Sequence, residues 1–210
     1  MANNALIIVD VQNDFLPGGA LVVPRANEII PVLHRIIPAF KNVIFTMDSH
    51  PKNHKSFASQ NPGKWPFKMG QINGRPQMMW PDHCIINSKG WLVEPTLGVR
   101  AVQAGARVEA VMKGTNPDFD SYSGFKDDGG AETILLPTLR LWDVGRLFVC
   151  GLATDYCVKA TALDGIDAGF QVSVVVAACR GLDGVEDAYI QMAERGIQLR
   201  HSEDLVEPIR

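Results

Sequence analysis

Short apolar segments that each end at a polar residue recur along the chain, and they constrain the fold more than any other feature. Within each segment the apolar residues are continuous and do not alternate with polar ones. Such runs are typical of strands covered on both faces, as in a parallel sheet. We therefore expect buried strands at residues 5–9, 43–47, 108–112, 147–149 and 172–178.

Segments with helical spacing of apolar residues lie between these strands. They cover residues 27–39, 156–168 and 185–195, and Pro38 lies near the end of the first. A proline ends a helix because it has no N–H to donate. Strands that alternate with helices form right-handed βαβ units and an open sheet with helices on both faces. The sequence therefore predicts an α/β fold with three layers, αβα, around a mostly parallel sheet.

One segment breaks this alternation. Residues 49–105 are rich in Pro, Gly, Asn and Trp and are too long for an ordinary connection. The strand pattern resumes after this segment, and no shift in composition marks a second core. A chain of 210 residues also fits one domain of ~100 to 200 residues. We expect a single domain over residues 1–210, with an insertion at about 49–105.

Charge and apolar content exclude several classes of function. Lys and Arg number 20 against 23 Asp and Glu, a net charge of -3, so the basic excess needed to bind a phosphate backbone is missing. No apolar run approaches the ~20 residues of a membrane span, and the N-terminus shows no secretory signal. The four cysteines lack C-x-x-C pairing and are expected as free thiols. We predict a cytoplasmic protein that binds neither nucleic acid nor membrane.

Reactive side chains follow several of the predicted strands. Asp10, Asp48 and Lys113 end three of them, and Cys157 comes one turn after a fourth. The carboxyl ends of parallel strands lie at one edge of the sheet, where ligands bind. Only a thiolate attacks a substrate, and its formation needs a base and a nearby positive charge. The pattern therefore predicts a nucleophile site at this edge.

Cys157 is the candidate nucleophile. Residues 147–158 predict a strand, a tight turn and a helix, which places this cysteine at a helix N-terminus. There the helix dipole lowers the pKa of a thiol, and unpaired backbone N–H groups can receive an oxyanion. A buried helix cysteine without a role is the alternative, and the turn, the dipole and two charged strand ends disfavour it. Cys150 and Cys179 lie inside apolar strands and are interpreted as small core residues.

Histidines gather in the insertion. Asp48 and His50 place a carboxylate and an imidazole close together, and His54 and His83 follow in the same segment. This set of donors suits a first-row transition metal. Each histidine alone would be interpreted as a hydrogen-bonded loop residue. Their grouping beside a strand-end Asp favours a metal site.

Three aromatic residues are expected near the same edge. Phe15 follows the first strand, Trp80 lies in the insertion and Tyr122 follows Lys113. Aromatic side chains beside a strand-end site can enclose a flat ring. Ordinary anchoring of loops is the alternative, and the sequence does not separate the two.

Together these motifs resemble the nicotinamidases of the isochorismatase-like cysteine hydrolase superfamily. The similarity covers nearly the whole chain and implies the αβα fold of that superfamily. It also implies hydrolysis of nicotinamide to nicotinate and ammonia in NAD salvage, with pyrazinamide as a second substrate. Relatives often form oligomers, so a homo-oligomer is expected. The motifs are Ile8 to Phe15, Asp48 to Pro51, Trp80 to Cys84, Met112 to Gly114 and Gly151 to Val158.

The resemblance assigns roles to the reactive residues. It implies that Cys157 attacks the carboxamide carbon to form a thioester, that Asp10 passes the thiol proton to the leaving ammonia, and that Lys113 favours the thiolate. It places an oxyanion hole at the backbone N–H groups of Ala153 and Cys157. A cis peptide is expected between Leu152 and Ala153.

The resemblance also implies one divalent metal ion that holds the pyridine nitrogen. Its ligands map onto Asp48, His50 and His83. The family varies in whether a fourth ligand near His54 binds directly or through water, so that residue stays open. Zinc is the expected ion, and iron and manganese are alternatives because an Asp/His set accepts all three.

The walls of the ring pocket map onto Phe15 and Trp80, and the match at Tyr122 is looser. Two positions depart from the usual pattern. Ser49 stands where relatives often have Trp or Phe, which is expected to reshape the outer wall of the metal site. Tyr156 precedes the nucleophile where His is also common, with no expected mechanistic consequence.

Three other functions compete with this interpretation. A related hydrolase of N-carbamoyl or ureido substrates would share Asp10, Lys113 and Cys157, but such relatives generally lack the metal set. A thiol sensor would use a reactive Cys157 and would need a resolving thiol nearby. A structural α/β binding module would leave the charged strand ends unexplained. The metal set favours a pyridine carboxamide as substrate.

Overall fold

A computed structural model describes residues 3–205 of the chain. Its centre is a six-stranded sheet with the order β5-β2-β1-β6-β7-β8, in which every neighbouring pair is parallel. Each predicted strand lies in this sheet, which confirms the parallel α/β fold. The strands are β1 (Asn3–Val9), β2 (Asn42–Asp48), β5 (Arg107–Lys113), β6 (Val144–Leu152), β7 (Gln171–Arg180) and β8 (Gln198–Arg200).

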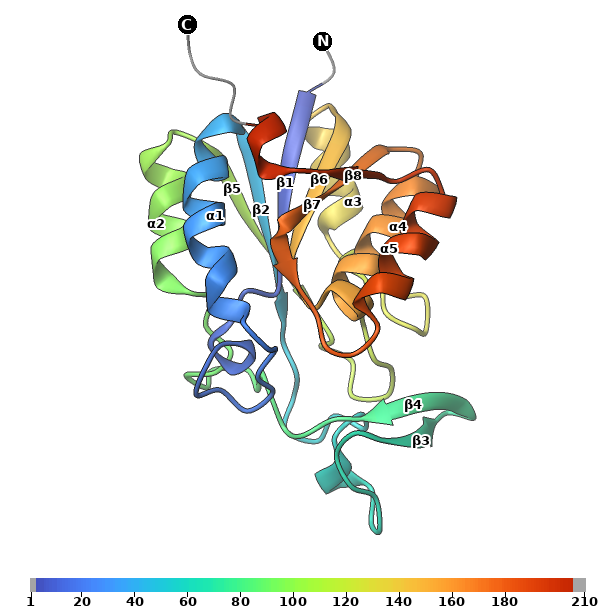
Figure 1. Cartoon of the computed structure of the whole chain (residues 1–210). Coiled ribbons are helices and arrows are strands. Elements are labelled where there is room, and N and C mark those ends of the chain that lie inside the picture. The colour runs from blue at the N-terminus through green and yellow to red at the C-terminus, as the bar shows by residue number, and fades with distance from the viewer. Residues whose placement is uncertain (1–2, 206–210) are drawn as a thin grey trace, which may run out of the picture.

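Helices cover both faces of the sheet and complete the three layers (Figure 1). Helices α1 and α2 lie on one side, and α3, α4 and α5 lie on the other. No helix within residues 3–205 is long and apolar enough to cross a membrane. The helices are α1 (Ile29–Ile36), α2 (Pro95–Gln103), α3 (Leu135–Leu141), α4 (Lys159–Asp167) and α5 (Val185–Glu194). Short 3-10 helices span Asn13–Phe15, Ala26–Glu28, Ile37–Ala39, Ala58–Gln60 and Ser202–Leu205, and a π-helical turn spans Thr154–Val158.

The strand order sets the position of the site. From β1 the chain moves outward through β2 to β5, and it then returns to the other side of β1 to form β6, β7 and β8. The loops that leave the carboxyl ends of β1 and β6 therefore diverge to opposite faces of the sheet. Ligands bind at such switch points in open α/β sheets because the diverging loops leave a crevice. We expect the pocket beside the ends of β1 and β6.

Burial explains why the apolar runs predict the sheet. Residues 5–9 of β1 are fully buried, since this strand lies between β2 and β6 and under helices on both faces. The edge strand β5 behaves differently: Val111 is buried, but Val108 and Met112 are exposed. An edge strand is covered on fewer sides, so its apolar content is a weaker guide to burial.

Helix α1 is shorter than the helix predicted over residues 27–39. It ends at Ile36, and a 3-10 turn follows that contains Pro38. Because proline has no N–H, the carbonyl of His34 loses its helical donor at this point. That carbonyl accepts a hydrogen bond from the Arg100 side chain of α2 instead, at 3.1 Å. The exchange joins α1 to α2 on the same face of the sheet.

The segment between β2 and β5 contains a regular helix and a separate hairpin. Helix α2 packs on the sheet as an ordinary crossover, and Glu94 caps its N-terminus by accepting from the N–H groups of Thr96 and Leu97. The irregular part of the predicted insertion therefore ends before Pro95. Strands β3 (Lys68–Ile72) and β4 (Arg75–Met79) form the hairpin.

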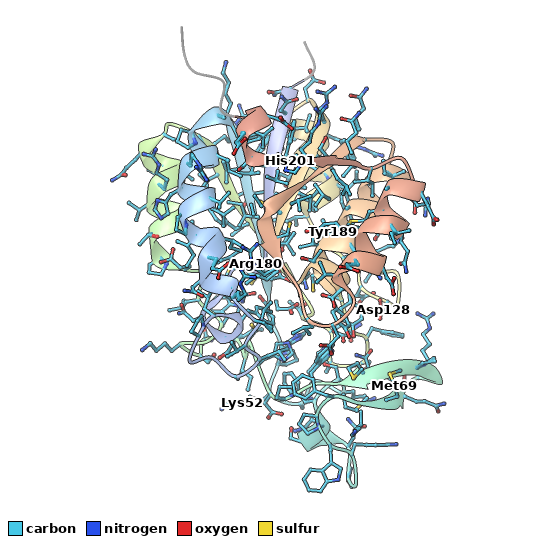
Figure 2. All side chains as sticks on the ribbon, in the orientation of Figure 1. Lys52, Met69, Asp128, Arg180, Tyr189 and His201 are labelled. Carbon is cyan, nitrogen blue, oxygen red and sulfur yellow. The ribbon has the colours of Figure 1, made fainter. Side chains whose placement is uncertain are left out.

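A two-residue turn, Asn73-Gly74, closes the hairpin, and both residues have positive φ angles of 50° and 75°. Asn-Gly is the preferred sequence for such a turn, a signal present in the sequence. The Asn73 side chain donates to the carbonyl of Asp118, and Arg75 donates to that of Asp128. Figure 2 shows Met69 of the hairpin toward the end of the molecule opposite His201, with Asp128 between the two and closer to Met69. The hairpin is thus attached to the loop that follows β5.

Candidate active site

The structure brings the predicted reactive residues together at the carboxyl edge of the sheet. Asp10 directly follows β1, while Asp48 and Lys113 are paired last residues of the neighbouring strands β2 and β5. Cys157 lies in the turn between β6 and α4. All four are buried, with exposures of 0%, 5%, 1% and 7% in chain order. The four strands that carry them converge on one crevice.

The ammonium of Lys113 is at the centre of this group. Its Nζ lies 2.9 Å from Asp10 Oδ2, 2.5 Å from Asp48 Oδ1 and 3.4 Å from Cys157 Sγ. It also donates to the carbonyl of Ser121 at 2.7 Å. One cation therefore contacts both carboxylates and the thiol, and it compensates charge that burial would otherwise make costly.

Burial and the neighbouring charges shift the pKa values of the three charged groups. Burial alone would lower the pKa of Lys113, but the Asp10 and Asp48 carboxylates outweigh it and raise that pKa well above its usual value. Burial raises the pKa of Asp10, against the opposing charge of Lys113. For Asp48 burial also acts upward, yet Lys113 and His50 hold the pKa well below its ordinary value. Asp48 is thus the permanent anion and Asp10 the group suited to exchange a proton.

The pKa of Cys157 differs from the prediction. Its pKa is raised well above the usual thiol value, because burial is the largest influence and outweighs the lowering effect of Lys113. The charges of Asp10 and Asp48 raise it further, and a carboxylate oxygen of Asp10 lies within 4.8 Å of the thiol sulfur. The resting nucleophile is therefore a neutral thiol beside a carboxylate that can accept its proton, and not a free thiolate.

The backbone around Cys157 leaves donors available. The peptide bond between Leu152 and Ala153 is cis, as the resemblance implies. The carbonyl of Ala153 accepts from the N–H groups of Tyr156 and Val158. Among residues 3–205, no group outside this helical turn accepts from the N–H of Ala153 or Cys157. Unpaired N–H groups in a first helical turn can stabilise an oxyanion.

Gly151 allows this turn to lie close to β1. Its φ angle is +115°, and a Cβ atom there would lie 2.2 Å from the carbonyl oxygen of Val9. Only glycine adopts this conformation at such a short distance from another backbone. The thiol turn and Asp10 therefore approach one another because residue 151 has no side chain.

Sequence reasoning missed two residues that position Asp10 and Asp48. The hydroxyl of Thr46 donates to Asp10 Oδ1 at 2.6 Å. The Gln12 side chain accepts from the N–H of Asp48 and donates to the carbonyls of Asp48 and Trp91. Both residues are fully buried although polar. A polar residue inside or beside an apolar run was the available signal, but the partners are distant in sequence.

Asp48, His50 and His83 form a set that can hold a metal ion. Asp48 Oδ2 lies 3.7 Å from His50 Nε2 and 3.8 Å from His83 Nε2. The Nδ1 atoms of the two histidines are 2.9 and 2.8 Å from the carbonyls of Gly114 and Pro81, so each must carry a hydrogen and donate it. That leaves both Nε2 atoms facing the carboxylate. A carboxylate and two imidazole nitrogens fit a divalent transition metal.

His54 is not part of this set. Its Nδ1 accepts from the N–H of Ser56, and its Nε2 lies 3.2 Å from the carbonyl of Phe119. Burial, and next the charge of His50, lower the pKa of His54 to about 4, so the ring is neutral. Both nitrogens already have partners in the protein. The geometry favours His54 as support for the neighbouring loop.

A pocket opens beside Cys157, and the three aromatic residues predicted for it, Phe15, Trp80 and Tyr122, all line it. Tyr156 completes the aromatic wall, with its ring centroid 5.1 Å from that of Trp80. Sequence reasoning did not include the aliphatic side, formed by Leu21, Val23 and Leu182, or the buried carboxylate of Asp120. These residues come from loops whose positions the sequence does not specify. The pocket suits a flat ring with a polar substituent at the thiol.

Comparison with known proteins agrees with this geometry. The chain matches the Isochorismatase domain family over residues 4–204. The chain belongs to the isochorismatase family. Within that family, the nicotinamidase of Escherichia coli (strain K12) is 42% identical over 208 residues, which cover 95% of this chain and 95% of that protein.

Solved structures of relatives share the fold of this family member. A nicotinamidase and pyrazinamidase of Acinetobacter baumanii superposes with a TM-score of 0.92 at 38% identity, covering 98% of this chain and 99% of that one. A pyrazinamidase of Pyrococcus horikoshii in complex with zinc gives a TM-score of 0.75 at 35% identity, covering 95% and 99%. The zinc complex and the Asp48, His50 and His83 set together support a divalent metal in this family fold.

Proposed function

We propose that this chain is a metal-dependent nicotinamidase, which hydrolyses nicotinamide to nicotinate and ammonia in NAD salvage. The observation that carries the proposal is the position of Cys157, whose thiol contacts Lys113, lies within 4.8 Å of an Asp10 oxygen and lines an aromatic pocket. Two metal-set residues, Asp48 and His83, line the same pocket. N-carbamoyl substrates have no ring nitrogen for a metal to hold. A hydrolase of such substrates would therefore not need that set of metal ligands.

The first half of the reaction transfers the acyl group to sulfur. The thiol proton of Cys157 passes to the Asp10 carboxylate as Sγ bonds to the carboxamide carbon, and the carbonyl oxygen becomes an oxyanion. The N–H groups of Ala153 and Cys157 stabilise that oxyanion. Asp10 then gives its proton to the amide nitrogen, the C–N bond breaks, and ammonia leaves a thioester. The raised pKa of Asp10 suits it to both transfers.

The second half releases the acid. Water attacks the thioester carbon while Asp10 accepts one of its protons, and the same backbone N–H groups stabilise the second oxyanion. The C–S bond then breaks, and Asp10 returns the proton to the departing sulfur. Lys113 stays charged throughout, because its pKa is held well above the usual value. Its ammonium stabilises the sulfur anion as it forms.

Asp48, His50 and His83 would hold the metal, and we propose zinc as the ion. When bound, the metal supplies a Lewis acid that fixes the ring nitrogen and so places the carboxamide at the thiol. Phe15, Trp80 and Tyr156 line the pocket around the ring. Pyrazinamide presents a ring nitrogen in the same way and is proposed as a second substrate. That the protein is cytoplasmic and homo-oligomeric stays a prediction.

We also propose that the chain is one domain over residues 1–210, of which 1–2 and 206–210 lie outside the described residues. The metal-site insertion supplies His50 and His83, while Asp48 belongs to the sheet. One core formed by the sheet and its helices supports both sets of residues. This arrangement makes the metal site depend on the same fold as the thiol.

Ammonia release from nicotinamide by the purified protein tests the proposal, before and after removal of metal by a chelator. Turnover that is lost on chelation and restored by added zinc supports the scheme. If turnover persists without metal, the protein is still a cysteine hydrolase, but the proposed role of the metal is wrong. No release in either state, with Cys157 still reactive toward a thiol reagent, favours an N-carbamoyl or ureido substrate instead.

A further inference from the structure

A buried network of hydrogen bonds connects the β3–β4 hairpin to the wall of the pocket. The Gln77 side chain in β4 places its Nε2 atom 2.6 Å from Asp120 Oδ2 and 2.9 Å from the hydroxyl of Tyr122. The carbonyl of Met78 lies 2.9 Å from the same nitrogen. The indole nitrogen of Trp80 lies 3.2 Å from the Tyr122 hydroxyl. Asp120, Tyr122 and Trp80 all line the pocket. The hydrolysis mechanism does not use this hydrogen-bond network.

Donor and acceptor chemistry fixes the direction of these hydrogen bonds. Asp120 accepts on both oxygens, from the N–H of Ser121 at 2.9 Å and from Gln77. Gln77 must therefore turn its amide nitrogen toward Asp120. An amide nitrogen and an indole nitrogen only donate, so neither Gln77 nor Trp80 can accept the hydrogen of the Tyr122 hydroxyl.

The hydroxyl hydrogen of Tyr122 is consequently free for a ligand. Within residues 3–205 no group accepts from this hydroxyl, although its oxygen is close to two donors. Burial, and next the charge of Asp120, raise the pKa of Tyr122 well above its ordinary value, so the hydroxyl keeps its hydrogen. A buried hydroxyl without an acceptor is costly until a ligand supplies one.

We propose that Asp120 is a positioning residue that makes the pocket wall a hydrogen-bond donor. Its carboxylate orients the Gln77 amide, and that orientation leaves the Tyr122 hydroxyl to donate to the substrate. The inference rests on the proposed function, because an aromatic carboxamide carries ring-nitrogen and carbonyl acceptors that such a donor binds. The preferred substrates are then flat aromatic amides with an acceptor facing Tyr122.

The variant Asp120→Asn tests this arrangement with almost no change in shape. The new amide oxygen can still accept from Ser121, but the new NH2 group faces Gln77 and forces its amide to rotate. The Gln77 oxygen then accepts the hydrogen of the Tyr122 hydroxyl, and the pocket loses its donor. We expect KM for nicotinamide to rise about tenfold, the effect of one hydrogen bond, while kcat changes little.

A double-mutant cycle distinguishes the effect of Asp120 on the Tyr122 hydroxyl from a general loss of structure. Tyr122→Phe removes the same donor, so the Asp120→Asn/Tyr122→Phe double variant should show no larger KM than either single variant. Asp118→Asn is the matched control: this carboxylate pairs with Lys55 on the surface and does not line the pocket, so KM should stay unchanged. If Asp120→Asn does not fold by circular dichroism, Tyr122→Phe alone carries the test, because it removes the donated hydrogen itself, and an unchanged KM for nicotinamide in Tyr122→Phe overturns the inference.

The outcomes distinguish this inference from the proposed function. If Asp120→Asn has the same kcat and KM as the wild type, the inference that Asp120 orients Gln77 is overturned. The proposed hydrolase function is then unaffected. Multiplied KM effects in the double variant would mean that Asp120 acts independently of Tyr122, which also overturns the inference. A wild-type protein that does not release ammonia from nicotinamide removes both the proposed function and this inference.

Discussion

Replacing Lys113 with methionine should expose the cost of two buried carboxylates without a counter-charge. In the native protein the ammonium lies 2.9 Å from Asp10 and 2.5 Å from Asp48, and its side chain is fully buried. Methionine has a similar length but no charge. Removing one partner of a buried ion pair costs about 3–5 kcal/mol. At about 2–4 °C per kcal/mol for a chain of this size, Lys113→Met should unfold roughly 6–20 °C below the wild type in the presence of a chelator.

The loss should depend on pH in a defined direction. Without Lys113, burial and mutual repulsion raise the pKa values of Asp10 and Asp48 in the folded variant above their unfolded values. The folded variant then binds more protons than its unfolded state, so it regains stability as pH falls. In the wild type the pKa of Asp48 is lowered, so its stabilising contribution is lost as pH falls through that value. Both effects make the difference in stability between the wild type and Lys113→Met smaller as the pH falls.

Urea unfolding followed by tryptophan fluorescence measures this loss at about pH 7 and about pH 5. Lys55→Met is the matched control, because Lys55 contacts Asp118 at 2.5 Å but both side chains are half exposed, at 52% and 51%. An exposed pair contributes at most ~1 kcal/mol. Equal losses in the two variants would refute the reasoning, and so would a loss at Lys113 that does not shrink at the lower pH.

Three further variants test the thiol and the metal set. Cys157→Ala should abolish ammonia release and leave the urea midpoint nearly unchanged, and substantial turnover by this variant would remove Cys157 as the nucleophile. His50→Ala should lower the metal content per chain and raise KM, whereas Lys52→Ala nearby should do neither; an unchanged metal content in His50→Ala would disprove the assigned site. Gly114→Ala should also lower the metal content, because a Cβ atom there would lie 2.5 Å from the His50 ring and the φ angle of +67° disfavours alanine; full metal occupancy would show that the ring tolerates the contact.

The success of the sequence in predicting the sheet has a local cause. Residues 5–9 are buried on every side, so selection for apolar residues leaves a continuous run that needs no knowledge of neighbours. Elements with more exposure gave weaker signals. Helix α3 is only seven residues long and includes Pro137, so it was not predicted. The Asn73-Gly74 pair is a usable signal for a hairpin turn. It was not used, because the whole segment was predicted to be an irregular insertion.

The direction of the Cys157 pKa shows where local reasoning fails. A helix N-terminus and a nearby cation both lower the pKa of a thiol, and the sequence predicts both. Burial outweighs them in the structure, and the distances to Asp10 and Asp48 add to its effect. Burial of one side chain depends on loops from four different strands. No spacing along the chain measures it.

The sequence by itself determined the chemistry that this chain can contain. Strand-end Asp10, Asp48 and Lys113, the thiol turn and the histidines of the insertion are set by local patterns, because each strand end and turn is specified by its own residues. Only the tertiary structure decided which groups touch: the ammonium of Lys113 between two carboxylates, and the contact of Gln77 with both Asp120 and Tyr122. Those contacts join residues 43 or more positions apart in the chain, and hydrogen bonds and Coulomb interactions depend on distance through space.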